Sequence, residues 1–234
     1  MALLEVSQLD AWYGPAQALF GVTLCVDAGQ SVVVLGRNGA GKSTTLKAIM
    51  GLEVRRRGAV AFDGTPIVDM TTHEIARLGL GYVPEDRRIF KGLTVDENLA
   101  VGRQAVRDGK AWTPKDLFQL FPNLGRMRNR LGSQMSGGEQ QMLTIARTLM
   151  GNPRCILLDE PSEGLAPVIL DGIAEALLEL RRRGVGLLVS EQNLGFARRI
   201  AERAYVIESG EIKFAGTMGE LEADEALRAE YLAV

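Results

Sequence analysis

The chain has 234 residues, of which 46% are hydrophobic and 24% charged, and its formal net charge is −2. This composition is that of a folded globular protein and excludes a disordered chain, because disorder accompanies low hydrophobicity and high net charge. The small net charge gives no global electrostatic reason for nucleic-acid binding, which usually depends on a concentrated basic surface, so no nucleic-acid partner is expected.

No stretch of the sequence is long enough to cross a membrane. The longest apolar runs, Ser31 to Leu35 and Cys155 to Leu158, fall far short of the roughly 20 residues that span a bilayer. The N-terminus has no basic segment followed by a long apolar one, so no secretory signal is expected and the pattern indicates the cytoplasm. Cys25 and Cys155 stand in apolar β-like runs and are expected as small buried side chains, without a disulfide or a metal site.

In chain order, the first elements are mostly strands. Leu4 to Leu9 and Leu19 to Val26 alternate polar and apolar residues, as strands of an antiparallel sheet do. Val32 to Leu35 is continuously apolar, as expected of a parallel strand that is covered on both faces. Helical spacing over Thr44 to Gly51 follows, and then an alternating strand at Gly58 to Phe62. The N-terminal part is therefore β-rich.

The remainder of the chain alternates buried strands with helices, as an α/β fold does. A buried strand is predicted at Gly81 to Pro84, and a mostly helical segment extends from about Thr94 to Met150. Strand and helix then alternate over Cys155 to Leu158, Val168 to Arg183, Gly186 to Ser190, Gly195 to Glu202 and Ala204 to Glu208. We expect one domain over 1–234, with a β-rich part at about 1–30 and 56–70, a core at about 31–55, 71–92 and 151–234, and a helical insert at about 93–150.

A phosphate-binding loop follows the strand that ends at Leu35. It reads Gly36-Arg37-Asn38-Gly39-Ala40-Gly41-Lys42-Ser43-Thr44 and fits the pattern GxxxxGK followed by Ser or Thr, between a strand and a helix. The glycines let successive backbone N–H groups face inward, where the positive end of the helix dipole adds to them. Lys42 is expected to reach the β- and γ-phosphates, and the Ser43 hydroxyl to ligate Mg²⁺.

Two adjacent carboxylates end the apolar strand that begins at Cys155. Asp159 and Glu160 stand at a strand end, where α/β folds place their ligands. Asp159 is expected to hold a water of the Mg²⁺ shell, and Glu160 to orient or deprotonate the water that attacks the γ-phosphate. Alone, such a pair would as often cap the next helix; together with the phosphate loop it indicates catalysis.

A Ser-Gly-Gly segment distinguishes this chain from other proteins with a phosphate loop. Met135-Ser136-Gly137-Gly138-Glu139-Gln140-Gln141 precedes a helix with apolar periodicity, about twenty residues before Asp159. Its Ser and Gly residues offer a hydroxyl and bare N–H groups at a helix start, which makes a second anion site. The segment resembles the LSGGQ signature of ABC ATPases, with Met and Glu substituted. In isolation it would be a plain helix cap.

The resemblance covers essentially the whole chain and implies an α/β P-loop NTPase fold, with a parallel core sheet, an N-terminal antiparallel β subdomain and an inserted α-helical subdomain. It also implies ATP hydrolysis with Mg²⁺ and a dimer in which the signature of one subunit, here Ser136 to Glu139, closes over the phosphate loop of the other. Tyr13, followed by Gly14, matches the aromatic residue that stacks on adenine in this family.

Two positions depart from the common ABC pattern. Many members carry Gln before the helical insert, where this chain has Glu85, and His after the last core strand, where it has Gln192. We expect Glu85 to lie near Mg²⁺, with its charge balanced by the metal or by Arg87 or Arg88. The resemblance also implies a membrane permease, and we expect Glu85 to couple the metal to the contact with that permease. Gln192 can donate to the γ-phosphate but cannot carry a proton, so no histidine-like titration is expected near neutral pH. The only histidine, His73, is expected in the first turn of a helix.

Both substitutions, with the segments from Ser136 to Met142 and from Glu160 to Pro167, resemble the LivF-type ATP-binding subunits of branched-chain amino-acid importers. That resemblance implies an integral-membrane permease, a periplasmic solute-binding protein, and either a LivG-like second ATPase subunit or a self-dimer. It places the chain on the cytoplasmic face of the cell membrane.

Several alternatives stay open at this point. Close relatives of the LivF type serve urea, short amides and aromatic acids. A soluble regulatory ABC ATPase acting on RNA or DNA would usually have two cassettes or a long coiled coil. Lipopolysaccharide or lipid export is disfavoured by Gln192, and a P-loop kinase or GTPase leaves the Ser-Gly-Gly segment unexplained.

Overall fold

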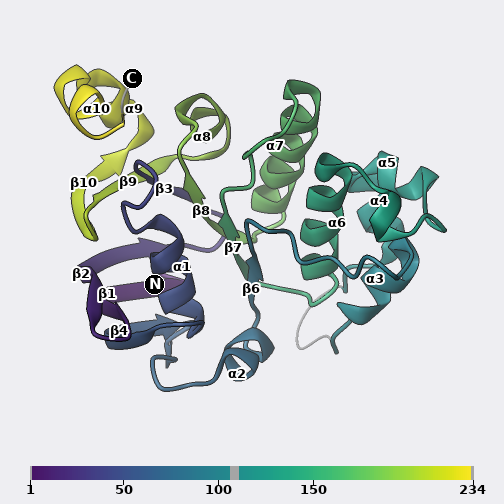
Figure 1. Ribbon diagram of the computed structural model, residues 1–234, viewed down its shortest axis with the longest axis horizontal. Helices are drawn as coiled ribbons and strands as arrows, with labels where there is room; N and C mark the ends of the chain where they lie inside the picture. Colours follow the sequence, from purple (N-terminus) through teal and green to yellow (C-terminus); the bar gives the residue numbers. More distant parts are fainter. Residues whose placement is uncertain (1, 106–110, 233–234) are drawn as a thin grey trace.

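A computed structural model describes residues 2–105 and 111–232 (Figure 1). Its first sheet is antiparallel and has the strand order β2-β1-β4-β5. The strands are β1 (Leu4–Tyr13), β2 (Ala16–Val26), β4 (Arg55–Phe62) and β5 (Thr65–Pro66). The antiparallel β part expected from alternating residues is therefore present, with longer strands than the alternation indicated.

The second sheet has six strands in the order β10-β9-β3-β8-β7-β6, and its strands are parallel except for β10. They are β3 (Ser31–Leu35), β6 (Leu80–Val83), β7 (Cys155–Asp159), β8 (Gly186–Glu191), β9 (Arg203–Glu208) and β10 (Glu211–Thr217). Because β8 lies between β3 and β7, the carboxyl ends of these three strands are neighbours. The segments that follow them meet at one edge of the sheet.

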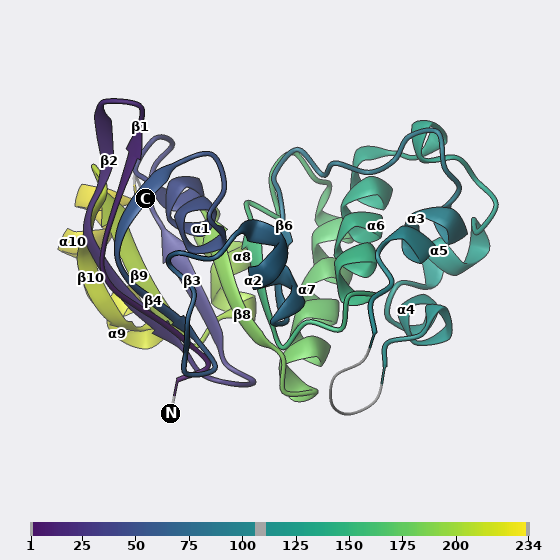
Figure 2. The same cartoon turned by 90° about the horizontal axis from the view of Figure 1, so that it is seen from below.

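The helices fall into two groups (Figures 1 and 2). One group accompanies the sheets: α1 (Lys42–Met50), α2 (Thr72–Arg77), α7 (Pro167–Arg182), α8 (Leu194–Ile200), α9 (Met218–Ala223) and α10 (Glu225–Tyr231). The other forms a separate lobe: α3 (Val95–Val101), α4 (Pro114–Leu120), α5 (Pro122–Arg126), the 3-10 helix η1 (Gly132–Gln134) and α6 (Gly137–Leu149). No helix within residues 2–105 and 111–232 has both the length and the apolar character needed to cross a bilayer.

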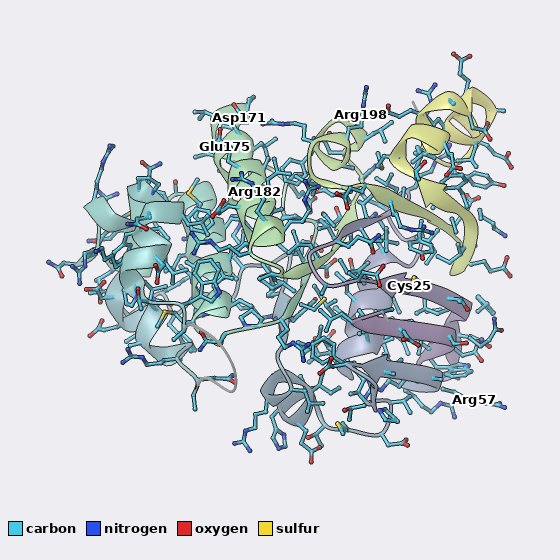
Figure 3. All side chains as sticks on the ribbon, turned by 180° about the vertical axis from the view of Figure 1, so that it is seen from behind. Cys25, Arg57, Asp171, Glu175, Arg182 and Arg198 are labelled. Atoms are coloured by element: carbon cyan, nitrogen blue, oxygen red, sulfur yellow. The ribbon has the colours of Figure 1, made fainter. Side chains whose placement is uncertain are left out.

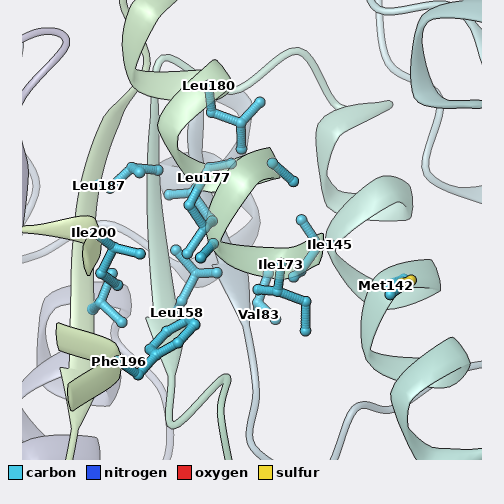
Figure 4. Close-up of a cluster of buried hydrophobic side chains, with 14 of the residues drawn as sticks. Val83, Met142, Ile145, Leu158, Ile173, Leu177, Leu180, Leu187, Phe196 and Ile200 are labelled. Carbon is cyan, nitrogen blue, oxygen red and sulfur yellow. The ribbon is translucent and has the colours of Figure 1, made fainter. Parts of the chain in front are cut away.

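Two hydrophobic clusters cover the two faces of the parallel sheet. Val32 and Val34 of β3 pack with α1 and the antiparallel sheet, whereas Val33 and Leu35 pack with α7, α8 and the helical lobe. Figure 4 shows part of the second cluster, with Leu177 of α7 among its members. Burial on both faces is the reason that β3 is continuously apolar.

Helix α7 shows how the sequence directs one face inward. Its Ile173, Leu177 and Leu180 are fully buried, whereas Asp171 and Glu175 are exposed and lie on its outer side (Figure 3). The spacing of three to four residues between the buried positions places them on one side of the helix. The helix predicted over Val168 to Arg183 therefore forms nearly as expected.

Strand β4 begins earlier than predicted because its charged residues have partners. The half-buried Arg56 donates hydrogen bonds of 2.6–3.0 Å to five backbone carbonyls, those of Ala48, Ile49, Ile67, Val68 and Met70. These carbonyls include the last turn of α1. The Arg run, which disrupts the alternating pattern, thus ties β4 to the helix that carries the phosphate loop.

The secondary structure of the C-terminal elements β10, α9 and α10 was not predicted from the sequence. Strand β10 lies at the edge of its sheet, and its residues alternate only between exposed and half-buried positions, so it lacks the apolar run of the core strands. Cys155 is buried as expected, whereas Cys25 is half-buried and its Sγ lies 3.7 Å from the Tyr205 hydroxyl. His73 is an exposed residue in the first turn of α2, as predicted.

Candidate nucleotide-binding site

The phosphate loop connects β3 to α1 and lies against the turn after β9. A Cβ on Gly36 would come inside 3.0 Å of the Ile207 carbonyl oxygen, and Gly41 has a φ of 115°, so both positions require glycine. The Gly210 N–H donates to the Ala40 carbonyl at 2.8 Å. The adjoining residues Asn38 and Gly39 are exposed. The backbone of the loop is therefore held from behind while its middle faces solvent.

Lys42 connects the phosphate loop with the carboxylate after β7. Its Nζ donates to the carbonyls of Gly36 at 2.9 Å and Arg37 at 3.1 Å, and lies 3.0 Å from Oε1 of Glu160. The Lys42 side chain is 2% exposed and that of Glu160 11%. The two residues expected to act on the γ-phosphate thus already touch, and an entering phosphate competes with these contacts for the ammonium group.

Asp159 is almost completely buried at the end of β7. Its Oδ2 accepts from the Tyr82 hydroxyl at 3.0 Å, and its Oδ1 from the Ser190 hydroxyl at 2.7 Å. Burial, together with the charge of Asp159, raises the pKa of Tyr82 well above its usual value, so that this phenol stays protonated and donates. The carboxylate is therefore fixed in direction by β6 and β8.

The donor set fits a Mg²⁺ ion that arrives with a nucleotide. Asp159 supplies a hard oxygen, and within the described residues the Ser43 hydroxyl has no hydrogen-bond partner and is free to supply another. No group of three or more His, Cys, Asp or Glu side chains in residues 2–105 and 111–232 is arranged to hold a metal alone. Mg²⁺ takes few protein ligands and completes its shell with water and phosphate oxygens.

Glu160 has a backbone conformation that is unusual for a residue other than glycine. Its φ is 43°, and its N–H donates to the carbonyl and the hydroxyl oxygen of Ser190 at 3.1 and 3.0 Å. A left-handed residue of this kind costs about 1–3 kcal/mol and persists where neighbouring groups hold it. Here Ser190 of β8 holds the backbone of Glu160, while Lys42 holds its side chain.

Ser190 and Glu191 of β8 are site residues that the sequence analysis did not single out. Glu191 is 1% exposed and accepts hydrogen bonds from Ser162, Gln192 and Asn193. Burial raises the pKa of Glu191 to about 7, which the bonds from Ser162 and Asn193 counteract and the nearby charge of Glu160 reinforces. The only signal for Glu191 in the sequence is a carboxylate at the end of an apolar strand.

Glu85 has an acidic neighbour, Glu163. It is exposed and is hydrogen-bonded to Glu163; partial burial and then the charge of Glu163 raise its pKa. Of the two arginines proposed to balance it, Arg88 pairs with Asp86 at 2.9 Å and with Glu53 at 3.6 Å, and neither arginine forms an ion pair with Glu85 in the described part of the chain. The carboxyl group therefore faces a second acid instead of a base.

Gln192 and Tyr13 lie at strand ends and are accessible. Gln192 is exposed immediately after β8, and its backbone N–H donates to Oε2 of Glu191 at 3.2 Å. Tyr13 is the last residue of β1 and is 41% exposed. Both side chains are thus free to meet a ligand from solvent.

The Ser-Gly-Gly segment forms the start of α6. Ser136 caps the helix, since its Oγ accepts from the Glu139 N–H at 3.4 Å. The Glu139 carboxylate in turn accepts from the Ser136 N–H at 2.7 Å and from its hydroxyl at 2.9 Å. A Cβ on Gly137 or Gly138 would come inside 3.0 Å of Arg87 or Ile169. Helices α1 and α6 lie in different parts of the molecule (Figures 1 and 2), so the segment is not set over this chain's own phosphate loop.

A glycine-rich loop connects the parallel strand β3 to α1 and faces a carboxylate that follows β7, the strand on the other side of β8. This arrangement defines a nucleotide-binding protein of the P-loop class. The family model described as ABC transporter matches residues 19–163. The chain belongs to the ABC transporter family.

Full-length relatives support this membership. The chain is 40% identical over 231 residues to the high-affinity branched-chain amino acid transport ATP-binding protein BraG of Pseudomonas aeruginosa, covering 98% of this chain and 99% of that protein. It is 35% identical over 239 residues to the lipopolysaccharide export system ATP-binding protein LptB of Haemophilus influenzae, covering 99% of this chain and 98% of that protein.

Solved structures share the fold. An ABC transporter ATP-binding cassette in its ADP conformation superimposes with a TM-score of 0.83 at 27% identity, covering 98% of each chain. A nucleotide-free cassette gives 0.82 at 28% identity, covering 97% of each chain. The predicted fold class is therefore confirmed. The chain is an ATP-binding and ATP-hydrolysing subunit of an ABC transporter.

Proposed function

We propose that this subunit powers the import of branched-chain amino acids through a separate integral-membrane permease. The observation that carries the proposal is the 40% identity with BraG over essentially the whole length of both chains. Glu85 and Gln192, the two departures from the common ABC pattern, agree with a LivF-type subunit. A LivG-like second ATPase subunit or a second copy of this chain, and a periplasmic solute-binding protein, complete the proposed assembly on the cytoplasmic face of the membrane.

Lipopolysaccharide export is the second candidate, because LptB of Haemophilus influenzae matches over a similar length at 35% identity. Urea, short amides and aromatic acids remain possible cargoes of an importer. The cargo is recognised by the permease and the binding protein, so residues of this chain do not select it directly. An experiment on the assembled transporter is therefore needed to choose among these cargoes.

In the proposed site, the phosphate loop from Gly36 to Thr44 binds the triphosphate, and Ser43 and Asp159 bind Mg²⁺. Bound Mg²⁺ would neutralise charge on the phosphate oxygens. Glu160, fixed by Ser190 and close to Lys42, accepts the proton of the attacking water or orients it. Its side chain is only 11% exposed, which supports this role, because a partly shielded carboxylate acts in a medium of lower dielectric constant than water.

The roles of the remaining site residues are proposed from their positions in the fold. Gln192 donates to the γ-phosphate, and Tyr13 stacks on adenine. The segment from Ser136 to Glu139 contacts the nucleotide of the partner ATPase subunit, which its distance from this chain's own loop supports. We also propose the domain limits given by the sequence: a β-rich part at about 1–30 and 56–70, a core at about 31–55, 71–92 and 151–234, and a helical insert at about 93–150.

The function is tested with the purified chain, its permease and second ATPase subunit, reconstituted in vesicles. Leucine-loaded solute-binding protein is expected to stimulate ATP hydrolysis, whereas binding proteins loaded with urea, an amide or an aromatic acid are not. Stimulation by one of these other solutes, or by lipopolysaccharide in place of a binding protein, would overturn the cargo assignment while leaving the ATPase assignment in place.

The role of Glu160 is tested with Glu160→Gln. We expect kcat to fall by roughly 10²- to 10⁴-fold with ATP binding retained, because a positioned proton acceptor contributes about that much. Light scattering after size exclusion, with and without ATP, then shows whether this variant forms a dimer by itself or only with the second subunit. Hydrolysis at the wild-type rate would contradict the assignment.

Glu85 is proposed to lie near Mg²⁺ and to couple it to the permease. Its carboxyl group is hydrogen-bonded to Glu163 and is affected by the charges of Glu160 and Asp159, so Mg²⁺ bound nearby would offset the repulsion among these acids. Glu85→Gln is expected to raise the Mg²⁺ concentration for half-maximal hydrolysis and to reduce transport for each ATP hydrolysed, with Glu163→Gln as the matched comparison. Unchanged Mg²⁺ dependence and transport in Glu85→Gln would refute the role.

A further inference from the structure

A buried carboxylate at the end of β8 joins two loops of the nucleotide site. Oε1 of Glu191 accepts from the Ser162 N–H at 3.1 Å. Its Oε2 accepts from the Ser162 hydroxyl at 2.9 Å, and from the N–H groups of Gln192 and Asn193 at 3.2 Å each. The side chain is 1% exposed. Among the described residues, every donor to this carboxylate therefore comes from one of two short segments.

Both segments carry groups that act on the nucleotide in the proposed function. Ser162 follows Glu160 by two residues, and Gln192 is the residue proposed to meet the γ-phosphate. The hydroxyl of the preceding residue, Ser190, already holds Asp159 at 2.7 Å, and its oxygens hold the N–H of Glu160. Two successive residues of β8 thus secure the chain on both sides of Glu160.

Only an ionised carboxylate accepts this set of bonds without offering a donor of its own. A carboxylate has about four acceptor positions, and the structure supplies three backbone N–H groups and one hydroxyl to them. A glutamine in its place would turn an NH₂ group toward backbone N–H donors. Burial makes the charge costly, which hydrogen bonds to the charged form offset in part.

We propose that Glu191 is a positioning residue for ATP hydrolysis, whose carboxylate holds the segment from Glu160 to Ser162 and the loop at Gln192 in one fixed arrangement. The inference rests on the proposed roles of Glu160 and Gln192. Glu191 is buried and acts through other residues: through Ser162, which follows Glu160 by two residues, and through the backbone of Gln192. The phosphate loop belongs to β3 and α1, and none of the hydrogen bonds to Glu191 involves it.

This arrangement separates chemistry from binding. Loss of the carboxylate releases Ser162, two residues after Glu160, and the loop at Gln192 from their common support, and a misplacement of the reacting groups by about 1 Å costs roughly 10²-fold in rate. ATP binding depends on the loop and on Lys42, whose partners Gly36 and Arg37 are unaffected. We therefore expect kcat to fall while KM and the Kd for ATP stay close to the wild-type values.

The test compares Glu191→Gln with wild type and with Glu175→Gln, an exposed substitution on the outer side of α7 (Figure 3). Steady-state hydrolysis, binding of a fluorescent ATP analogue and thermal unfolding are measured for each. Glu191→Gln is expected to lose about 10- to 100-fold in kcat and to bind ATP within about twofold of wild type. A wild-type kcat, or equal losses in kcat and ATP binding, would overturn the inference.

Ser162→Ala keeps the inference testable if Glu191→Gln folds poorly. It removes one hydrogen bond to the carboxylate and is expected to give a smaller loss of kcat, with ATP binding retained. Combined with Glu191→Gln, it is expected to add almost nothing, because the interaction is already broken. Full additivity of the two losses, or no loss in Ser162→Ala, would contradict the inference.

Glu160→Gln separates this inference from the proposed function. If Glu160→Gln is inactive and Glu191→Gln hydrolyses ATP normally, only the positioning role of Glu191 fails. If Glu160→Gln is fully active, the catalytic assignment itself fails, whatever Glu191 does.

Discussion

The pH dependence of stability gives a quantitative prediction for Glu191. Burial raises the pKa of this carboxyl group from 4.5 to about 7, against the effect of its hydrogen bonds and with that of the charge on Glu160. Since the folded pKa lies above the unfolded one, the folded chain binds more protons between these two values. The free energy of unfolding therefore falls as pH rises from 4.5 through 7.

The size of this effect follows from the interval between the two pKa values. An interval from 4.5 to about 7 corresponds to about 3 kcal/mol, since one pH unit is worth about 1.4 kcal/mol. Between pH 5 and pH 8 the contribution amounts to about 2–3 kcal/mol. Glu191→Gln has no titrating group at this position, so its stability profile lacks this contribution.

The assay is urea unfolding of wild type, Glu191→Gln and the control Glu175→Gln at several pH values between 5 and 8, followed by tryptophan fluorescence at constant ionic strength. The difference in unfolding free energy between wild type and Glu191→Gln is expected to change by about 2–3 kcal/mol over this range, to the disadvantage of wild type at high pH. Parallel profiles for these two proteins would refute the reasoning.

Two further predictions concern the phosphate loop and its support. Arg56→Lys is expected to lower the unfolding free energy by about 2–4 kcal/mol, because an ammonium group cannot reach all five carbonyls. The control Arg57→Lys, at an exposed position, is expected to change it little, and urea unfolding measures both variants. Gly36→Ala is expected to weaken ATP binding at least tenfold, because the added Cβ would clash with the Ile207 carbonyl. Gly92→Ala is the control, because a Cβ at that position would have no neighbouring atom within 4 Å. Wild-type binding of a fluorescent ATP analogue by Gly36→Ala would contradict this reading of the loop.

The prediction for hydrolysis at neutral pH also changes with the structure. From Gln192 alone, no histidine-like titration is expected in kcat. The structure adds Glu191, with a pKa of about 7, at the end of β8 next to Gln192, while His73 is an exposed residue of α2. If a titration near pH 7 is observed, it should be absent in Glu191→Gln and unaffected in His73→Asn.

The sequence by itself determined the class of the protein, because the decisive motifs are contiguous. The phosphate loop from Gly36 to Thr44 needs only its own glycines and the following helix, and the strand that ends at Asp159 is recognised by its apolar run. Local patterns also predicted the buried strands, since burial on both faces leaves a signature within a few residues.

Only the tertiary structure decided which polar groups meet. The strand order β3-β8-β7 brings Glu191 to Ser162 and Lys42 to Glu160, although these residues are far apart in the chain. No local pattern encodes such pairings, because they depend on which strand ends become neighbours. For the same reason the sequence offered only the metal or the nearby Arg87 and Arg88 to balance Glu85, whereas the fold places Glu163 beside it.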